Sequence, residues 1–268
     1  MNKFCDARDD YRRFLRTIDL KYYRDLFKDR KYVEQDLPKD VVDEILSSIY
    51  EYCWFKREFR SFDTWFEILW DKVRNLRSFN DFIWKYWHMR LGREIEWDEW
   101  FKMGFKARMY RTWTAILTQL DFCYTMACVV ERSQLNLKLQ SSAHLNKEGV
   151  DLRVVVSDKI IDFQVHKVSE RKEARPGRLR KPIIFIPYPV ISRRELDERS
   201  RSSTKRRGSY VVMLRTFDKY YEELENGFIV FKEELAKEIV RRISSGEDIG
   251  NFVNELTRCL RGVESCNL

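Results

Sequence analysis

Residues that break helices are almost absent from the first 148 positions of the chain. Only two glycines occur before Gly149, and Pro38 is the only proline before Pro176. Glycine and proline disfavour a helix interior by about 1 and about 3 kcal/mol relative to alanine, so a stretch poor in both favours helices. We therefore expect a mainly helical region that begins near Asp9 and ends near Glu131.

Apolar residues in this region recur at helical spacing. All eight tryptophans lie between Trp54 and Trp113. One apolar stripe contains Phe62, Trp65, Phe66, Leu69, Trp70 and Val73. Intervals of three and four residues place side chains on one face of a helix. Because aromatic side chains bury large areas, packing in a helical core accounts for such stripes without any ligand.

The segment from Phe105 to Val130 is predicted to form one long, mostly buried helix. Arg108, Arg111 and Gln119 interrupt its apolar faces. Buried polar groups need hydrogen-bond partners, so we expect these three side chains to face a functional site or a subunit interface.

The hydrophobic spacing changes after Glu131. Leucines alternate with polar residues over positions 135–139, which predicts a half-buried strand. The runs 150–156 and 160–168 predict the two strands of a hairpin, and Ile183–Ile186 predicts another strand.

We therefore expect an α+β chain. A mainly helical region would span residues 1–131, and a sheet-bearing region with C-terminal helices would span residues 132–268. The two regions are expected to form one globular unit. A length of 268 residues with 44% hydrophobic composition is sufficient for a sizeable core.

Several protein classes are disfavoured. No run approaches the roughly 20 apolar residues of a membrane span, and residues 1–10 lack the apolar core of a signal peptide. The six cysteines form no C-x-x-C pair, and their spacing indicates neither a zinc site nor a disulfide framework. We therefore expect a folded protein of the reducing cytoplasm without a membrane partner.

The positive charge of the chain is concentrated in one segment. Between Lys167 and Arg207 there are 14 Lys and Arg residues against 5 Asp and Glu, a local charge of +9 within a chain of net charge +8. An anionic partner such as nucleic acid is therefore expected to bind there, although a solvated basic loop would have the same composition. The polar, Arg-rich stretch Ser192–Ser209 is expected to be a loop that is either mobile or ordered by a ligand.

Polar residues of the expected hairpin suggest a site for phosphodiester hydrolysis. Asp151 opens the first strand, and the second strand contains Gln164, His166 and Lys167. Such sites combine a carboxylate that holds Mg²⁺ with a second ligand and, two positions later on the same strand face, a lysine. In strict alternation Gln164 is the second ligand and His166 takes the place of the lysine. Lys167 would serve only if a bulge turned it inward.

Four segments of the chain resemble the TaqI family of type II restriction endonucleases, whose members cut the palindrome TCGA. The segments are Tyr32–Pro38, then Ala107–Trp113 with Leu117–Leu120, then Glu148–Val154, and finally Lys167–Ala174 followed by Pro187 and Tyr188. They keep their order and rough spacing over about residues 10–190.

The resemblance implies a Mg²⁺-dependent endonuclease with a mixed sheet of the PD-(D/E)XK type. The catalytic aspartate of the family falls on Asp151, and a catalytic lysine falls on Lys167. Two positions depart from the family pattern. Asn146 stands where the family has an acidic residue, and His166 stands where it has a second lysine. Whether His166 or Lys167 serves the site is therefore left open.

The resemblance also implies partners: double-stranded DNA, a second copy of the chain in a homodimer that matches a palindrome, and a cognate DNA methyltransferase. Asp151 and Gln164 are the expected metal ligands. The expected DNA contacts are Arg108, Arg111, Gln119, Arg171, Lys172, Arg175, Arg178, Arg180 and Lys181.

Two other functions fit the same residues. One is a structure-directed repair nuclease that cuts junctions or flaps irrespective of sequence. The other is a catalytically inactive DNA-binding protein, in which Gln164 and His166 mark a metal site that has been lost.

Overall fold

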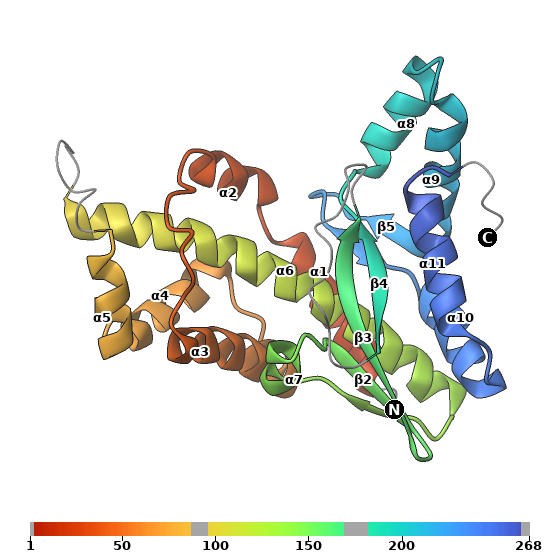
Figure 1. Ribbon diagram of the computed structural model, residues 1–268, viewed down its shortest axis with the longest axis horizontal. Helices are drawn as coiled ribbons and strands as arrows, with labels where there is room; N and C mark the ends of the chain where they lie inside the picture. The colour runs from red at the N-terminus through yellow and green to blue at the C-terminus, as the bar shows by residue number, and fades with distance from the viewer. Residues whose placement is uncertain (1–2, 87–95, 169–181, 264–268) are drawn as a thin grey trace. The chain divides into compact units, whose positions relative to one another are not determined.

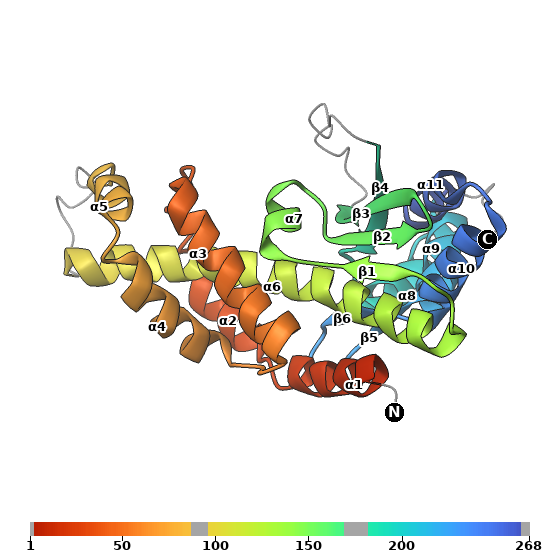
Figure 2. The ribbon, with the colours of Figure 1, turned by 90° about the horizontal axis from the view of Figure 1, so that it is seen from below.

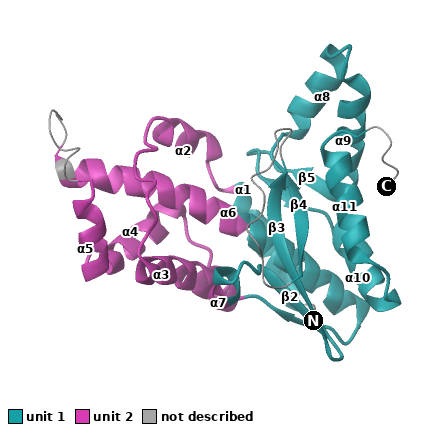
Figure 3. Ribbon diagram, in the orientation of Figure 1, with its two compact units in different colours: residues 1–16, 118–141, 145–268 teal, residues 17–117, 142–144 magenta. Residues whose placement is uncertain are grey.

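The computed structural model describes residues 3–86, 96–168 and 182–263. They form an α+β fold, with helices over most of the N-terminal half and strands from residue 138 onward (Figure 1). The expected α+β class is thereby confirmed. The chain divides into two compact units (Figure 3). Unit 1 comprises Met1–Arg16, Thr118–Ser141 and Leu145–Leu268, and unit 2 comprises Thr17–Leu117 and Ser142–His144. The expected division at residue 131 stays a prediction.

Unit 2 is helical. Its elements are α2 (Leu20–Phe27), α3 (Lys39–Tyr50), the π-helix η1 (Glu51–Lys56), α4 (Phe62–Val73), α5 (Arg77–Trp84) and the first part of α6 (Trp97–Ser133). Ser61 accepts a hydrogen bond from the backbone of Thr64 and so caps α4. Aromatic rings fill the core, and the ring of Phe105 lies 5.0 Å from that of Phe79. The helices and the aromatic core expected from the sequence are both present.

Unit 1 contains a four-stranded sheet in the order β1-β2-β3-β4. The strands are β1 (Lys138–Gln140), β2 (Leu152–Val156), β3 (Lys159–Val168) and β4 (Ile183–Pro189). The first three are antiparallel, and β4 is parallel to β3. The predicted hairpin of β2 and β3 and the additional strand β4 are confirmed. A second antiparallel sheet consists of β5 (Tyr221–Glu223) and β6 (Ile229–Phe231).

Helices cover both faces of the four-stranded sheet. The last part of α6 runs along one face, where the ring of Phe122 lies 6.1 Å from that of Phe163 on β3 (Figure 2). On the other face, helix α11 (Ile249–Leu260) lies against β4, and His166 and Val168 of β3 face the same helix. Helices α9 (Arg207–Tyr220) and α10 (Glu233–Ser245) complete the C-terminal part of the unit.

Most of the stretch expected to be a mobile or ligand-ordered loop is instead helix α8 (Arg193–Ser202). Ser192 caps it by accepting a hydrogen bond from the backbone of Glu195. Ion pairs four residues apart support it: Arg194 with Glu198, Arg199 with Glu195, and Arg201 with Asp197. The loop prediction was wrong because it weighed the net charge and not the spacing of opposite charges, which favours a helix.

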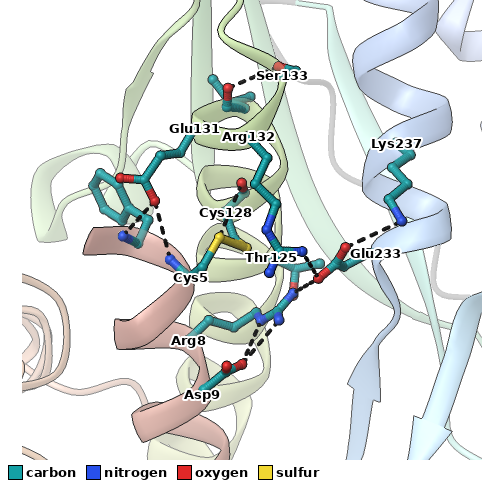
Figure 4. Close-up of a disulfide and its surroundings, with 12 residues drawn as sticks. Cys5, Arg8, Asp9, Thr125, Cys128, Glu131, Arg132, Ser133, Glu233 and Lys237 are labelled. Carbon is teal, nitrogen blue, oxygen red and sulfur yellow. Dashed lines mark hydrogen bonds and ion pairs between the residues drawn. A yellow bond between two sulfur atoms is a disulfide. The ribbon is translucent and has the colours of Figure 1, made fainter. Parts of the chain in front are cut away.

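A disulfide joins α1 (Lys3–Arg16) to the last part of α6 (Figure 4). Its residues, Cys5 and Cys128, are 123 positions apart in sequence, and their Cα atoms lie 4.5 Å apart. Glu131 of α6 accepts hydrogen bonds from the backbone N–H groups of Phe4 and Cys5 and so caps the first turn of α1. The spacing of the cysteines did not indicate this bond, because the pairing depends on how two distant helices pack.

A buried ion pair links the same two helices to β6. Arg12 donates to Asp121 (3.2 Å), to Thr125 (3.2 Å) and to the carbonyl of Phe231. The other carboxylate oxygen of Asp121 accepts the backbone N–H of Phe231 at 2.7 Å. Burial raises the pKa of Asp121, and Arg12 opposes this effect.

Among the described residues, α6 is the only helix long and apolar enough to cross a membrane. Of its most apolar stretch, 83% is buried within the structure. That degree of burial is what a core helix of a folded protein has.

Candidate active site

Asp151 lies in a bend directly before β2. The short helix α7 (Ala143–Lys147) precedes it, and Gly149 takes a φ of +78°, a left-handed conformation that glycine adopts without strain. This turn directs the carboxylate of Asp151 inward, so that the residue is only 1% exposed. Because Asp151 precedes the strand, its direction is determined by its contacts and not by strand alternation.

Both carboxylate oxygens of Asp151 accept hydrogen bonds. Asn146 Nδ2 donates to Oδ1 at 2.9 Å, and the backbone N–H of Val165 donates to Oδ2 at 2.7 Å. Burial raises the pKa of Asp151 to about 7, although both donors lower it. Burial therefore favours the neutral acid, and a nearby cation would favour its charged form.

Helix α6 holds this arrangement at two points. Gln119 Oε1 accepts a hydrogen bond from Asn146 Nδ2 at 3.0 Å. Ser141 Oγ donates to the carbonyl of Asp151 at 2.7 Å, and Cys123 Sγ lies 3.4 Å from the same oxygen. Gln119 and Cys123 are four residues apart and so lie on one face of the helix. One residue contacts the group that holds the side chain of Asp151, and the other contacts its main chain.

Strand alternation separates the candidate residues of β3 between two faces. Phe163, Val165 and Lys167 point toward α6, because Phe163 packs on Phe122 there. Tyr188, which pairs with Lys167 in the register of β3 and β4, hydrogen-bonds Thr118 of α6.

Gln164 and His166 alternate onto the other face of β3. His166 lines a cavity of about 340 Å³ between the sheet and α11, and its ring lies 5.8 Å from that of Phe185. Asn254, Thr257 and Arg261 of the C-terminal part line the same cavity.

The register of β3 with β4 is regular through Val168, so no bulge turns Lys167 onto the face of Gln164, and Lys167 alternates onto the face toward α6 instead. Its side chain is exposed and makes no hydrogen bond or ion pair with another described residue. The amide of Gln164 approaches the turn before Asp151, since a Cβ on Gly149 would lie 3.7 Å from Gln164 Nε2. The structure thus brings Asp151 and Gln164 near the same turn and separates Lys167 from His166.

Asp162, the other carboxylate of β3, is engaged by an arginine. Arg153 donates to both of its oxygens, at 2.7 and 2.9 Å, across the register of β2 and β3. Asp162 is buried, so this bidentate pair compensates its charge and leaves it unsuited to hold a metal.

A metal at this site would depend on few protein ligands. The described part of the chain contains no group of three His, Cys, Asp or Glu side chains that could hold a metal ion. Mg²⁺ is commonly held by one or two carboxylates, with water and substrate phosphate completing the shell. Each oxygen of Asp151 accepts one hydrogen bond and so has a further lone pair, and Gln164 offers a carbonyl oxygen. These residues fit a Mg²⁺ ion whose remaining ligands are water and a substrate phosphate.

Arg108 and Arg111 lie in unit 2 and contact their own chain. Arg108 donates to the carbonyl of Gln35, and Arg111 pairs with Glu34. The same segment is held by Tyr32, whose ring stacks on Trp100 at 4.2 Å. The two arginines therefore fix the segment between α2 and α3.

The remaining predicted DNA contacts are not all described. Arg171, Lys172, Arg175, Arg178, Arg180 and Lys181 lie in residues 169–181, outside the described residues. Gln119 is described and is hydrogen-bonded to Asn146.

The sequence analysis gave no function to Ser141 or Cys123, and it treated Asn146 only as a departure from the family pattern. Their roles depend on contacts between segments distant in sequence, which no spacing rule detects.

Comparison with known proteins places these residues in a family. Residues 8–243 match the TaqI restriction endonuclease family, which is most of the chain. The chain belongs to this family.

Two relatives of the TaqI family show the extent of the similarity. The type II restriction enzyme TthHB8I of Thermus thermophilus is 29% identical over 272 residues, which cover 97% of this chain and 92% of the relative. The type II restriction enzyme TaqI of Thermus aquaticus is 31% identical over 244 residues, which cover 87% and 86%. No solved structure matches the chain. The resemblance drawn from the sequence is confirmed, and with it the assignment to the type II restriction enzymes.

Proposed function

We propose that this member of the TaqI family hydrolyses double-stranded DNA at a TCGA-like palindrome in a Mg²⁺-dependent reaction, on a sheet of the PD-(D/E)XK type. The observation that carries the proposal is Asp151: a buried carboxylate at the start of a hairpin strand, with both oxygens oriented by hydrogen bonds. It lies within the part of the chain that matches the family.

In this proposal Asp151 and the side-chain carbonyl of Gln164 hold the metal. A divalent metal bound there would supply a Lewis acid for the phosphoryl oxygen and a water of lowered pKa. The ammonium of Lys167 positions the attacking water and stabilises charge on the phosphate. Lys167 is proposed over His166 because an ammonium group can stabilise the negative charge that develops on the phosphate. For this role the end of β3 has to turn Lys167 toward the face of Gln164.

The proposed DNA contacts are the six basic residues of positions 169–181, which follow Lys167 directly in sequence. Arginine and lysine there would bind phosphates, and an arginine could read guanine. Arg108 and Arg111 stay predicted contacts, but to bind DNA they would have to exchange Gln35 and Glu34 for phosphate. Gln119 also stays in the predicted set, although its contact with Asn146 favours another role.

A palindromic site is matched most simply by a two-fold symmetric pair of chains, so we propose a homodimer. An endonuclease that cuts a four-base site would also cut the DNA of its own cell. A methyltransferase that modifies the same sequence is therefore the expected second component of the system.

The alternative with a specific observation behind it is a catalytically inactive DNA-binding protein. The described residues contain no group of three possible metal ligands, and Asp162, the other carboxylate of β3, is paired with Arg153. Digestion of a sequenced plasmid with Mg²⁺, with and without EDTA, tests the proposal. We expect discrete fragments whose ends map to TCGA sites and disappear with EDTA. Cutting only at junctions would indicate a repair nuclease, and DNA binding without any cutting would indicate the inactive protein.

Replacing Asp151 with alanine is expected to reduce cleavage at least about 1000-fold, because several kcal/mol of metal-dependent stabilisation are lost. DNA binding in a gel-shift assay should be retained, since a carboxylate next to phosphates is removed. The matched control is Asp158→Ala, an exposed aspartate in the turn of the same hairpin, which should cleave like the wild type. Wild-type cleavage by Asp151→Ala would contradict the site assignment.

A further inference from the structure

We propose that Gln119 and Asn146 are positioning residues for Asp151: Gln119 fixes the side-chain amide of Asn146, and Asn146 fixes the carboxylate. The inference rests on the proposed function of Asp151 as a metal ligand and deepens it. It gives Gln119 a role within unit 1 instead of a contact with DNA.

The geometry of Asn146 carries the proposal. A single nitrogen, Nδ2, donates to Gln119 Oε1 at 3.0 Å and to Asp151 Oδ1 at 2.9 Å. An amide nitrogen has two hydrogens, and here each is directed to a carbonyl or carboxylate oxygen. The oxygen of Gln119 therefore determines which way the amide of Asn146 faces. A rotated amide would instead direct its own oxygen at Asp151, where two acceptors would repel.

The helices around Asp151 explain why Asn146 needs the hydrogen bond to Gln119. Asn146 belongs to α7, a helix of only five residues, which is too short to fix a side chain by itself. Gln119 belongs to α6, a helix of 37 residues. Cys123 and Ser141 anchor the carbonyl of Asp151 from the same helix face and from the residue after β1. The long helix thus provides a rigid reference for both the main chain and the side chain of Asp151.

Two substitutions each remove one residue of the chain of hydrogen bonds from Gln119 through Asn146 to Asp151. Gln119→Met keeps the volume and removes the acceptor, and Asn146→Leu removes the donor itself. Gln119→Glu keeps an acceptor oxygen and serves as the conservative variant. The control is Asn226→Leu in the same unit: Asn226 donates to the carbonyl of Leu15 at 2.7 Å and accepts from the backbone of Phe228, so it is a structural amide that does not contact Asp151.

Three quantities are measured for each variant: kcat and KM on a plasmid with TCGA sites, the affinity for Mn²⁺ by electron paramagnetic resonance with uncut DNA duplex present, and the thermal midpoint. Residues that orient a metal ligand typically contribute 10- to 100-fold to activity or metal affinity. We expect Gln119→Met to lower kcat and Mn²⁺ affinity about 10-fold with KM for DNA unchanged. Asn146→Leu should lose at least as much, and Gln119→Glu should stay within about threefold of the wild type.

The alternatives give different patterns. If Gln119 contacts DNA, Gln119→Met raises KM and leaves kcat and Mn²⁺ affinity unchanged, and the proposal is overturned. If the amide is only structural, Gln119→Met behaves like Asn226→Leu, with a lower thermal midpoint and unchanged kcat and Mn²⁺ affinity. A wild type that binds Mn²⁺ but does not cut DNA would refute the proposed function while the Mn²⁺ comparison still tests the brace. A wild type that binds no Mn²⁺ would refute both.

Discussion

The two parts of helix α6 both pack aromatic rings but differ in the polar groups that they bury. In unit 2 the helix packs aromatic rings: Phe105 lies 5.0 Å from Phe79, and Trp113 lies 5.4 Å from Phe62. In unit 1 the helix buries polar groups, and Asp121 and Thr125 are both fully buried. The first part makes its charged contacts, such as that of Arg111 with Glu34, at exposed positions.

This difference shows where the side chains must meet a hydrogen-bond partner in a set direction and where they need only fill the right volume. Apolar packing tolerates exchange of side chains of similar volume, because dispersion contacts are not directional. A buried polar group must meet its partner at a set distance and angle, since a missed hydrogen bond inside the protein is costly. The polar part of α6 is also the part that holds Asn146 and the main chain of Asp151. The candidate site is therefore held by the part of α6 that makes buried hydrogen bonds.

The largest effect on stability is expected from Arg12→Met. This change removes the cation that hydrogen-bonds the buried carboxylate of Asp121, and breaking one side of a buried pair costs about 3–5 kcal/mol. The matched change in the other part of the helix is Arg111→Met, which breaks an exposed pair and should cost less than about 1 kcal/mol. Urea unfolding of both variants measures the contrast. Equal losses would show that the two parts of α6 do not differ in this way.

The next effect concerns the two faces of β3, which carry Lys167 and His166. Lys167→Ala should lower kcat about 100-fold, because a charged group that stabilises the transition state is lost. His166→Ala, on the α11 face, should change kcat by less than about threefold, since its ring packs beside Phe185. Single-turnover cleavage rates decide between them. A more severe His166 variant would mean that His166, which shares its strand face with Gln164, takes the place of the lysine.

A substitution in the apolar part tests close packing instead of direction. A Cβ on Gly104 would lie 2.3 Å from the ring of Tyr32 and 2.7 Å from the side chain of Val33. Gly104→Ala should therefore destabilise the protein by about 1–3 kcal/mol despite the better helix propensity of alanine. The control is Gly250→Ala in α11, whose nearest contact is the carboxylate of Asp248 at 3.1 Å. If both variants melt together with the wild type, the segment around Tyr32 is not packed on α6.

Much of the fold could be predicted because it depends on local patterns. The scarcity of helix breakers predicted the N-terminal helices, and β-prone runs separated by turns predicted β2, β3 and β4. Helix α8 was missed because charge composition was weighed above the spacing of opposite charges. The disulfide between Cys5 and Cys128 could not be predicted, since it depends on how distant helices pack.

The candidate site divides in the same way. Asp151 was found from a local motif, whereas the bonds from Gln119 to Asn146 and from Ser141 to Asp151 join separate segments of the chain. Strand alternation was applied correctly in placing Gln164 and His166 on one face. The face that carries the network of Asp151 could only be determined from the contacts of α6, which were not visible in the sequence.

The smallest effect is expected at the end of the polar part of α6, where Glu233 binds three cations (Figure 4). Burial would raise the pKa of Glu233, but Arg8, Lys237 and Arg132 together lower it to about 2. A carboxyl with a lowered folded-state pKa contributes stability above its unfolded value, near 4.5, and loses that contribution as the pH falls toward 2. Because Arg132 and Lys237 are about half exposed, the contribution should be on the order of 1 kcal/mol. Urea unfolding of the wild type and Glu233→Gln should therefore differ at pH 6 and converge only below about pH 2. Glu234→Gln, next to it and exposed, should show no such difference at either pH. A constant difference between wild type and Glu233→Gln over this range would mean that the charge of Glu233 adds nothing to the attachment of α1 to α6.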